Sequence, residues 1–181
     1  MDTIQTKTAR YEQIIGLTNT KSGTRQCRIW LVINKNDSFG FYAQFTDETK
    51  IWGVSCSVEK ANSRVELHDI DTPIKSGLGA VLMWLVCEYA VGRRLLVFYV
   101  TEGVSPYWEK TAVPEGWLNV NRTFNNGEFQ GRVADVLRRC RQSAIDRGWD
   151  ITPLEGLRQY IRNQHPKSHS PDVYTAPENL R

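Results

Sequence analysis

The most constraining feature of this sequence is an apolar segment of helical length followed closely by an apolar segment of strand length. Residues 77–90 carry apolar side chains nearly all round, so a helix formed there must pack against other elements. The run at 95–100 (LLVFYV) is continuous and apolar, which is typical of a central strand buried on both faces. A helix directly before such a strand predicts a crossover connection within a mixed sheet.

Three strand-like segments precede this helix, at 28–34 (RIWLVIN), 39–45 (FGFYAQF) and 51–58 (IWGVSCSV). Turn-forming residues separate them, and connections this short predict an antiparallel meander. Residues 65–70 fit either a fourth strand or a first helical turn, and Pro73 ends either one. We therefore predict an α/β domain with a mixed five-stranded sheet that contains a three-stranded antiparallel meander.

The C-terminal half predicts further helices. Ser105 and Pro106 open a candidate short helix, residues 128–146 form an amphipathic pattern, 149–152 fit a short strand, and 154–163 fit a last helix. The expected organisation is an N-terminal arm or short helix at 1–25, one domain at 26–165 and a flexible tail at 166–181.

Composition excludes several classes of protein. The chain has 181 residues, 40% of them hydrophobic, and a formal charge of +3, which suits one globular domain without a strongly basic surface. The four cysteines are widely spaced, which favours buried reduced thiols over a zinc site. No signal peptide or membrane span is visible, so the expected location is the cytoplasm. The three histidines are isolated in sequence, and none is expected to be catalytic.

Residues 62–67 (NSRVEL) stand between the meander and the apolar helix and combine Asn, Arg and Glu within five positions. The order of elements together with this run resembles the ribonuclease H-like fold, in which a similar run opens the first long helix. Thr101-Glu102 stands after the central strand, where that family has a hydroxyl residue followed by an acid. Gly116-Trp117 and the arginine-bearing helix resemble the region that handles the substrate. The resemblance covers about residues 27–165.

This resemblance implies a metal-dependent nuclease that cleaves or binds RNA or an RNA–DNA hybrid. Glu66 and Glu102 would be metal ligands and catalytic residues, with Asp37 as a third catalytic carboxylate and Mg²⁺ or Mn²⁺ as the cofactor. The first strand ends in Asn34 rather than the usual Asp, and only Asp150 and Asp172 are candidates for a fourth acid. A non-catalytic interaction module is therefore an alternative, as are plain surface acids at the ends of elements.

Arginines of the amphipathic helix are candidates for tracking a phosphate backbone, and a nearby tryptophan for stacking on bases. The residues are Arg132, Arg138, Arg139, Arg141 and Trp117. Acidic residues are interleaved with these arginines, so an ordinary solvated face of mixed charge explains them equally well.

A second family competes with the first. Residues 65–70 followed by 75–82 (KSGLGAVL) are similar to strand four and the glycine loop of GNAT acyltransferases. The resemblance implies coenzyme A as cofactor, with Gly77 and Gly79 at its pyrophosphate. The run at 106–110 (PYWEK) resembles a later family helix, in which Tyr107 would be a general acid. Two departures are Ile74, which stands in place of the usual Arg or Gln, and the little room for two N-terminal helices within residues 1–25.

Overall fold

The computed structural model describes residues 9–20, 23–34, 36–73, 75–100, 119–120 and 129–162. Within these residues the chain forms three α-helices, one short 3₁₀ helix and one open sheet. In chain order the elements are β1 (Ala9–Asn19), β2 (Gly23–Ile33), β3 (Ser38–Phe45), β4 (Trp52–Glu59), β5 (Arg64–Asp71), α1 (Leu78–Gly92), β6 (Val97–Val100), β7 (Asn119–Val120), β8 (Phe129–Arg132), α2 (Val133–Asp146), β9 (Trp149–Asp150), η2 (Thr152–Leu154) and α3 (Glu155–Arg162).

The sheet is mixed and largely antiparallel, with the strand order β7-β8-β6-β5-β4-β3-β2-β1-β9. The predicted meander is confirmed, because β2, β3 and β4 pair antiparallel in sequence order. The predicted five-stranded sheet is wrong, because nine strands join it in the described part of the chain. One added strand is β1, which lies where a polar arm or short helix was expected and pairs along its whole length with β2. The predicted domain limits at 26 and 165 remain predictions.

The predicted crossover is confirmed. Strand β5 leads into α1, and α1 returns the chain to β6, which pairs parallel to β5 from Arg64↔Val97 to Leu67↔Val100. Residues 65–70, which fitted either strand or helix, belong to β5. Because parallel neighbours need a connection that spans the sheet, α1 is fixed against the face of the strands that it links.

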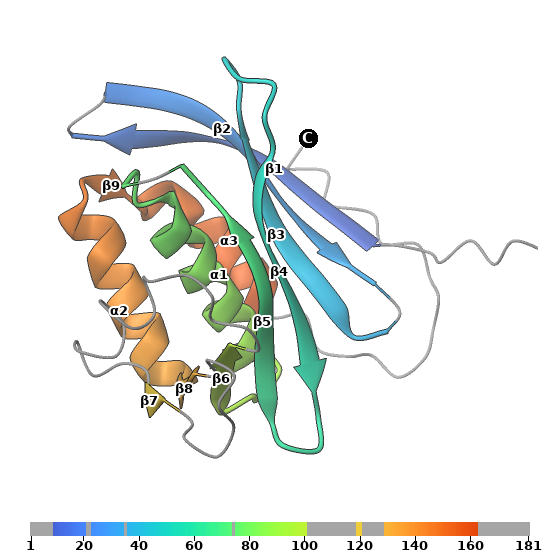
Figure 1. Cartoon of the computed structure of the whole chain (residues 1–181). Coiled ribbons are helices and arrows are strands. Elements are labelled where there is room, and N and C mark those ends of the chain that lie inside the picture. The colour runs from blue at the N-terminus through green and yellow to red at the C-terminus, as the bar shows by residue number, and fades with distance from the viewer. Residues whose placement is uncertain are drawn as a thin grey trace, which may run out of the picture.

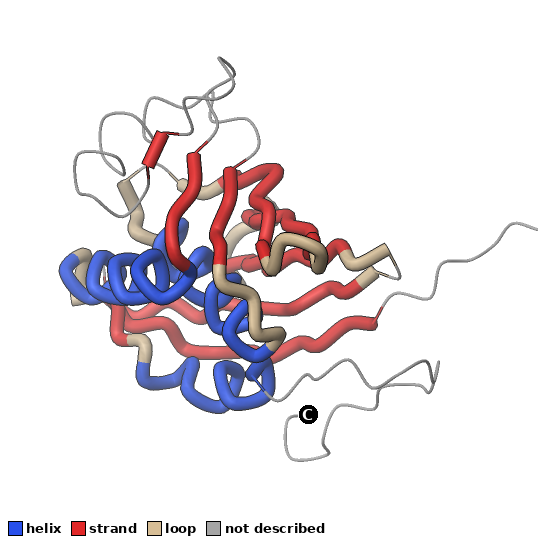
Figure 2. The backbone as a smooth tube through the Cα atoms, turned by 90° about the horizontal axis from the view of Figure 1, so that it is seen from below, coloured by secondary structure: helices blue, strands red, loops and turns tan. Residues whose placement is uncertain are grey.

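The three helices lie on one side of the curved sheet, with α1 between α2 and α3 (Figure 1). The view from below shows the same helices beside the long strands (Figure 2). Every residue of α1 from Val81 to Ala90 is buried, because the sheet covers one side of this helix and the other two helices cover the rest. This position explains why its sequence is apolar nearly all round.

Alternation along the strands separates a core face from an outer face. On β3 the side chains of Phe39, Phe41, Ala43 and Phe45 are buried in the core. Tyr42 points to the opposite face, where its ring lies over the backbone of Gly53, and a Cβ added to that glycine would come within 2.4 Å of the ring. The outer face of the meander therefore carries a different set of side chains from the face that packs on the helices.

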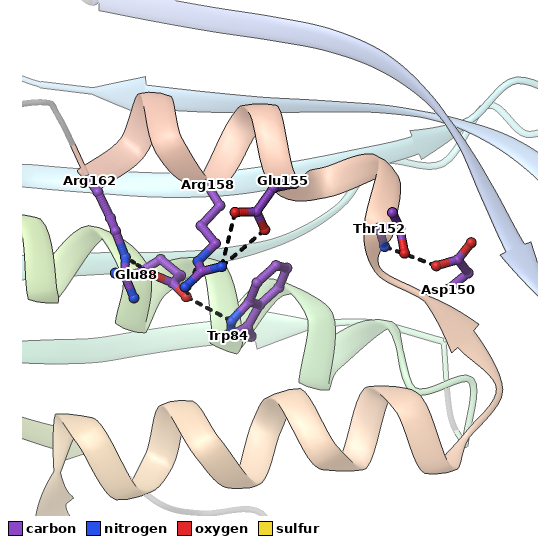
Figure 3. Close-up of polar contacts among 7 residues, drawn as sticks. All are labelled: Trp84, Glu88, Asp150, Thr152, Glu155, Arg158 and Arg162. Atoms are coloured by element: carbon purple, nitrogen blue, oxygen red, sulfur yellow. Dashed lines mark hydrogen bonds and ion pairs between the residues drawn. The ribbon is translucent and has the colours of Figure 1, made fainter.

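Helix α3 is attached to α1 through a buried carboxylate (Figure 3). Glu88 is 1% exposed and accepts a hydrogen bond from Trp84 Nε1 at 3.0 Å. Arg158 Nε lies 3.0 Å from Glu88 Oε1, and Arg162 Nε donates to Glu88 Oε2. The apolar side of α3 is formed by Leu157 and Ile161, which are both buried. Two cations and an indole therefore compensate the buried charge of Glu88.

The four cysteines are free and buried, as the sequence predicted. None of the helices in the described ranges has the length and apolarity needed to cross a membrane.

Candidate functional site

The glycine turn, defined here as residues 75–79, joins the carboxyl end of β5 to the start of α1. Two of its residues adopt left-handed backbone conformations, Lys75 with φ 58° and Gly77 with φ 77°. Ser76 Oγ donates to the carbonyl of Pro73 at 2.8 Å and accepts from the backbone N–H of Leu78 at 3.1 Å. The serine hydroxyl thereby bridges the end of the preceding segment and the first backbone N–H of α1, which fixes the conformation of the turn.

The corner between α2 and β9 braces the glycine turn from outside. Trp149 Nε1 donates to the carbonyl of Ser76 at 2.7 Å, and Arg147 Nη1 donates to the carbonyl of Lys75 at 3.3 Å. The corner is itself tied to the end of β1, where the Asn19 side chain donates to the carbonyl of Arg147 at 3.0 Å. Segments far apart in the sequence therefore meet at the start of α1.

A Cβ added to either glycine of the turn would be crowded by neighbouring side chains. A Cβ on Gly77 would lie 2.9 Å from Arg147 Cδ and 2.9 Å from Trp149 Nε1. A Cβ on Gly79 would lie 3.1 Å from Thr72 Oγ1, so α1 starts in close contact with the end of β5. Tight packing alone thus accounts for both glycines, and it also leaves the backbone of the turn without side chains of its own at these positions.

The electrostatics of the turn favour an anion. The start of a helix carries a partial positive charge from its unpaired N–H groups, and α1 has no acidic residue in its first turn. The exposed side chains of Lys75 and Arg147 add two cations beside it. A phosphate group is the kind of ligand that such a helix start accommodates.

A second group of polar side chains lies on the outer face of the sheet. Ser57 Oγ on β4 and His68 Nε2 on β5 are 2.6 Å apart. The register between these strands shifts at Ser55/Cys56, so that His68 is an extra residue on β5 between Leu67 and Asp69. His68 is isolated from the other histidines in sequence, but strand pairing brings a hydroxyl to its ring.

The three carboxylates of the predicted metal-dependent site do not form a cluster within the described residues. Glu66 lies within β5 rather than at the opening of a helix, and its Oε1 is 2.5 Å from Arg64 Nη2. Asp37 forms ion pairs with Lys60 at 2.8 Å and Arg93 at 3.5 Å. Glu102 lies outside the described residues. Among the residues that the structure does describe, no group of three His, Cys, Asp or Glu side chains is placed to hold a metal ion.

The arginines predicted to contact nucleic acid are exposed around α2. Arg138 Nη2 lies 2.6 Å from Asp135 Oδ1, and Arg132 Nε lies 3.9 Å from Asp135 Oδ2. The interleaved acids thus pair with the arginines, as the mixed-charge alternative expects. Arg139 and Arg141 are exposed on the same helix, and Trp117 lies outside the described residues. No observation tests a role for these five residues.

Comparisons with known proteins give structural similarities only. No protein-family model matches the chain, and no curated protein matches its sequence. The structure is similar to that of a nourseothricin acetyltransferase, with a TM-score of 0.42 and 18% identity over 72% of this chain and 89% of that one. It is also similar to a cAMP-binding acyltransferase from Mycobacterium smegmatis, with a TM-score of 0.49 and 8% identity over 74% of this chain. The match covers 56% of that second protein.

The prediction of a ribonuclease H-like, metal-dependent nuclease is wrong. That reading requires the run at 62–67 to open the first long helix, whereas the run enters β5 and the helix begins only at Leu78. The residues between Glu66 and α1 belong to the second half of β5 and to the glycine turn. Among the described residues, neither Mg²⁺ nor Mn²⁺ has a site.

Sequence reasoning missed Arg147 at the glycine turn and Ser57 beside His68. Both contacts join residues that are distant along the chain, and no local pattern marks them. The Ser57–His68 contact could have been predicted only from the pairing of β4 with β5, once the register of these strands is known.

Proposed function

We propose that this protein is an acyltransferase that uses an acyl-coenzyme A, with the glycine turn as its cofactor site. The observation that carries the proposal is the position of this turn at the start of α1, inside the parallel β5–α1–β6 crossover. Ligands of open α/β sheets bind beyond the carboxyl ends of parallel strands, where helix starts present N–H groups to phosphate.

The residues of the turn fit a pyrophosphate. Gly77 and Gly79 would present backbone N–H groups that no side chain of their own covers, and the first turn of α1 offers no acid that would repel the anion. This chain has Ile74 where the GNAT loop usually has Arg or Gln. Arg147 and Lys75 would supply positive charge to the turn instead. The cofactor would supply an activated acyl thioester. Tyr107, the general acid implied by the resemblance, lies outside the described residues.

Binding of coenzyme A tests this proposal directly. Isothermal titration calorimetry should detect binding of coenzyme A but no comparable binding of adenosine, which lacks the pyrophosphate. Arg147→Gln should weaken binding by roughly tenfold or more, because one charge-assisted contact is lost. Arg139→Gln is the matched control, since it removes an exposed arginine from the helix before the same corner. Absence of coenzyme A binding, or equal losses in both variants, would refute the proposed site.

A further inference from the structure

The outer edge of β1 is open along most of its length. Strand β2 pairs with the whole of β1 on one side. On the other side, β9 pairs only with Thr18 and Asn19. In the described part of the chain, no strand pairs with this second side of β1 between residues 9 and 17. Unpaired N–H and C=O groups along the edge of a sheet are a template for pairing with another strand.

The backbone groups that face this open edge belong to the even-numbered residues of β1. The N–H of Thr20 donates to the carbonyl of Gly148 at 3.0 Å, which continues the pairing of β1 with β9 by one position. In an antiparallel strand, the N–H and C=O of successive residues point to alternate sides. Residues 10, 12, 14 and 16 therefore each offer one donor and one acceptor to a strand that lies beside β1.

Strand β1 lacks the features that usually protect an edge strand from pairing. Residues 9–17 (ARYEQIIGL) contain no proline and no lysine. The register with β2 is continuous over all of β1, so no bulge turns the strand away from a neighbour. Nine residues in extended conformation span roughly 30 Å, which is long enough for several hydrogen-bonded pairs.

The charges of β1 are complementary to those of a second copy of the same strand. Two identical strands that pair antiparallel are related by a two-fold axis, and the residue on the axis faces itself. An axis at Tyr11 places Arg10 opposite the partner's Glu12, and by symmetry Glu12 opposite the partner's Arg10. Pairs of opposite charge and pairs of aromatic residues both stabilise neighbouring strands when they lie directly opposite each other.

Other registers fit the sequence less well. An axis at Glu12 would place two carboxylates directly opposite each other, which is destabilising. An axis at Gln13 would place Arg10 opposite the partner's Gly16 and Glu12 opposite the partner's Ile14, so no charges would pair. A shift by a single residue would set groups that face the open edge against groups that face β2, and no hydrogen bonds could form.

We propose that the protein forms a symmetric dimer in which the β1 strands of two copies pair antiparallel about an axis at Tyr11. The two nine-stranded sheets then form one continuous sheet through the dimer. The hydrogen-bonded pairs nearest to the axis join Arg10 to the partner's Glu12. This inference does not depend on the proposed acyltransferase function, because no residue of the glycine turn takes part in the pairing.

Reversing the charges tests the pairing. Sedimentation equilibrium should show a monomer–dimer equilibrium for the wild type. Glu12→Arg sets two arginines opposite each other on both sides of the axis and should raise the dissociation constant of the dimer by roughly tenfold or more. Glu12→Arg combined with Arg10→Glu makes the opposing charges unlike again and should restore the wild-type constant.

Asp146→Arg is the matched control for this experiment. It changes the net charge by the same amount at an exposed position of α2, and it should leave the dissociation constant unchanged. A wild type that is monomeric at its highest soluble concentration overturns the proposal. So does a dimer that Glu12→Arg does not weaken, or one that the double variant does not restore.

Single engineered cysteines test the register. With the axis at Tyr11, Tyr11→Cys brings two thiols to directly opposite positions, where the Cβ atoms of a pair are about 4.5–5.5 Å apart. Oxidised glutathione should therefore link this variant into covalent dimers, but should not link Gln13→Cys, whose two thiols are four residues out of register. The four native cysteines are buried and should not react. Linkage at position 13 but not at 11 overturns the register, and linkage at neither overturns the pairing of the edges.

Amide hydrogen exchange separates a second copy from any other occupant of the edge. The amides of Arg10 and Glu12 should exchange more slowly as the protein concentration rises through the dissociation constant. The amides of Tyr11 and Gln13, which face β2, should be protected at every concentration and serve as the internal control. Protection of Arg10 and Glu12 that persists in the dilute monomer would show that another segment of the same chain covers the edge, and would overturn the dimer.

Discussion

Gly77 and Gly156 are a matched pair for testing how far the glycine turn depends on its backbone. Gly77 has φ 77° and its Cβ would meet Arg147 and Trp149 at 2.9 Å, whereas a Cβ on Gly156 in α3 would meet nothing within 4 Å. We expect Gly77→Ala to lower the free energy of unfolding by about 2 kcal/mol, from the left-handed conformation and the contacts together. Gly156→Ala should raise it by up to about 1 kcal/mol, because alanine favours helix.

Urea denaturation followed by circular dichroism measures both changes. The two substitutions add the same methyl group, so their difference isolates the local geometry. If Gly77→Ala proved neutral, the turn would not be held by the Arg147–Trp149 corner.

The buried thiols make stability depend on alkaline pH. Burial raises the pKa of Cys27 and of Cys140 to about 12, and it also raises the pKa of Cys56 and Cys87. An unfolded thiol loses its proton near pH 8.5, so between that pH and the folded pKa the unfolded state is favoured by ionisation. The contribution of these thiols is therefore fully present at neutral pH and is lost as the pH rises.

Cys140→Ala checks this sign. Between pH 7 and pH 10 one such thiol costs the folded state about 2 kcal/mol, so the free energy of unfolding should fall less steeply in the variant than in the wild type. The difference in slope is the relevant quantity, because the cavity left by the substitution lowers both ends of the curve equally. Parallel curves would show that the thiol ionises as readily in the folded protein as in the unfolded chain.

At the scale of elements, local pattern predicted the meander and α1, because their apolar periodicity is contained in each segment. It also predicted α2, but residues 129–132, assigned to the same helix, form β8. It did not predict β1, which pairs along its whole length with β2. It also left residues 65–70 open between strand and helix, since a bulge at His68 interrupts the alternation that would have marked a strand. The bulge arises from pairing with β4, which no window of the sequence contains.

Attachment of α3 to α1 depends on the Glu88 carboxylate. An isolated helix of this length is marginal, so tertiary contacts must hold it. Glu88→Gln leaves Arg158 and Arg162 without their shared charge and should cost about 1–3 kcal/mol, less than for a fully buried pair, since both arginines are partly exposed. Amide hydrogen exchange should accelerate first in α3, before the sheet is affected.

Glu155→Gln is the control for this substitution. Glu155 also pairs with Arg158, at 3.0 Å, but its side chain is 52% exposed, so its loss should cost less than about 1 kcal/mol. Equal effects of the two substitutions would mean that burial of Glu88 does not determine its contribution.

At the scale of the whole molecule, the sequence indicated two folds, and the order of the strands decided against one of them. The run at 62–67 carried residues expected for a nuclease, yet the same residues continue into β5 and lead to the glycine turn. Strand order depends on contacts between segments that are distant in the sequence. The identity of the residues between two elements therefore does not predict it. The carboxylates Glu66 and Asp37 are instead paired with nearby cations.

Helix α1 connects the layers of the molecule, since it touches the sheet as well as α2 and α3. Leu85 on this helix is 0% exposed, and Leu85→Ala should lower the free energy of unfolding by about 3–4 kcal/mol through lost burial and a residual cavity. Because the described core is one continuous cluster, the wild type and the variant should each unfold in a single transition at different midpoints. Coincident curves from far-ultraviolet circular dichroism and tryptophan fluorescence would establish this. Two separate transitions in the variant would show instead that the sheet keeps its structure after its contact with α1 is weakened, and that the layers are held independently.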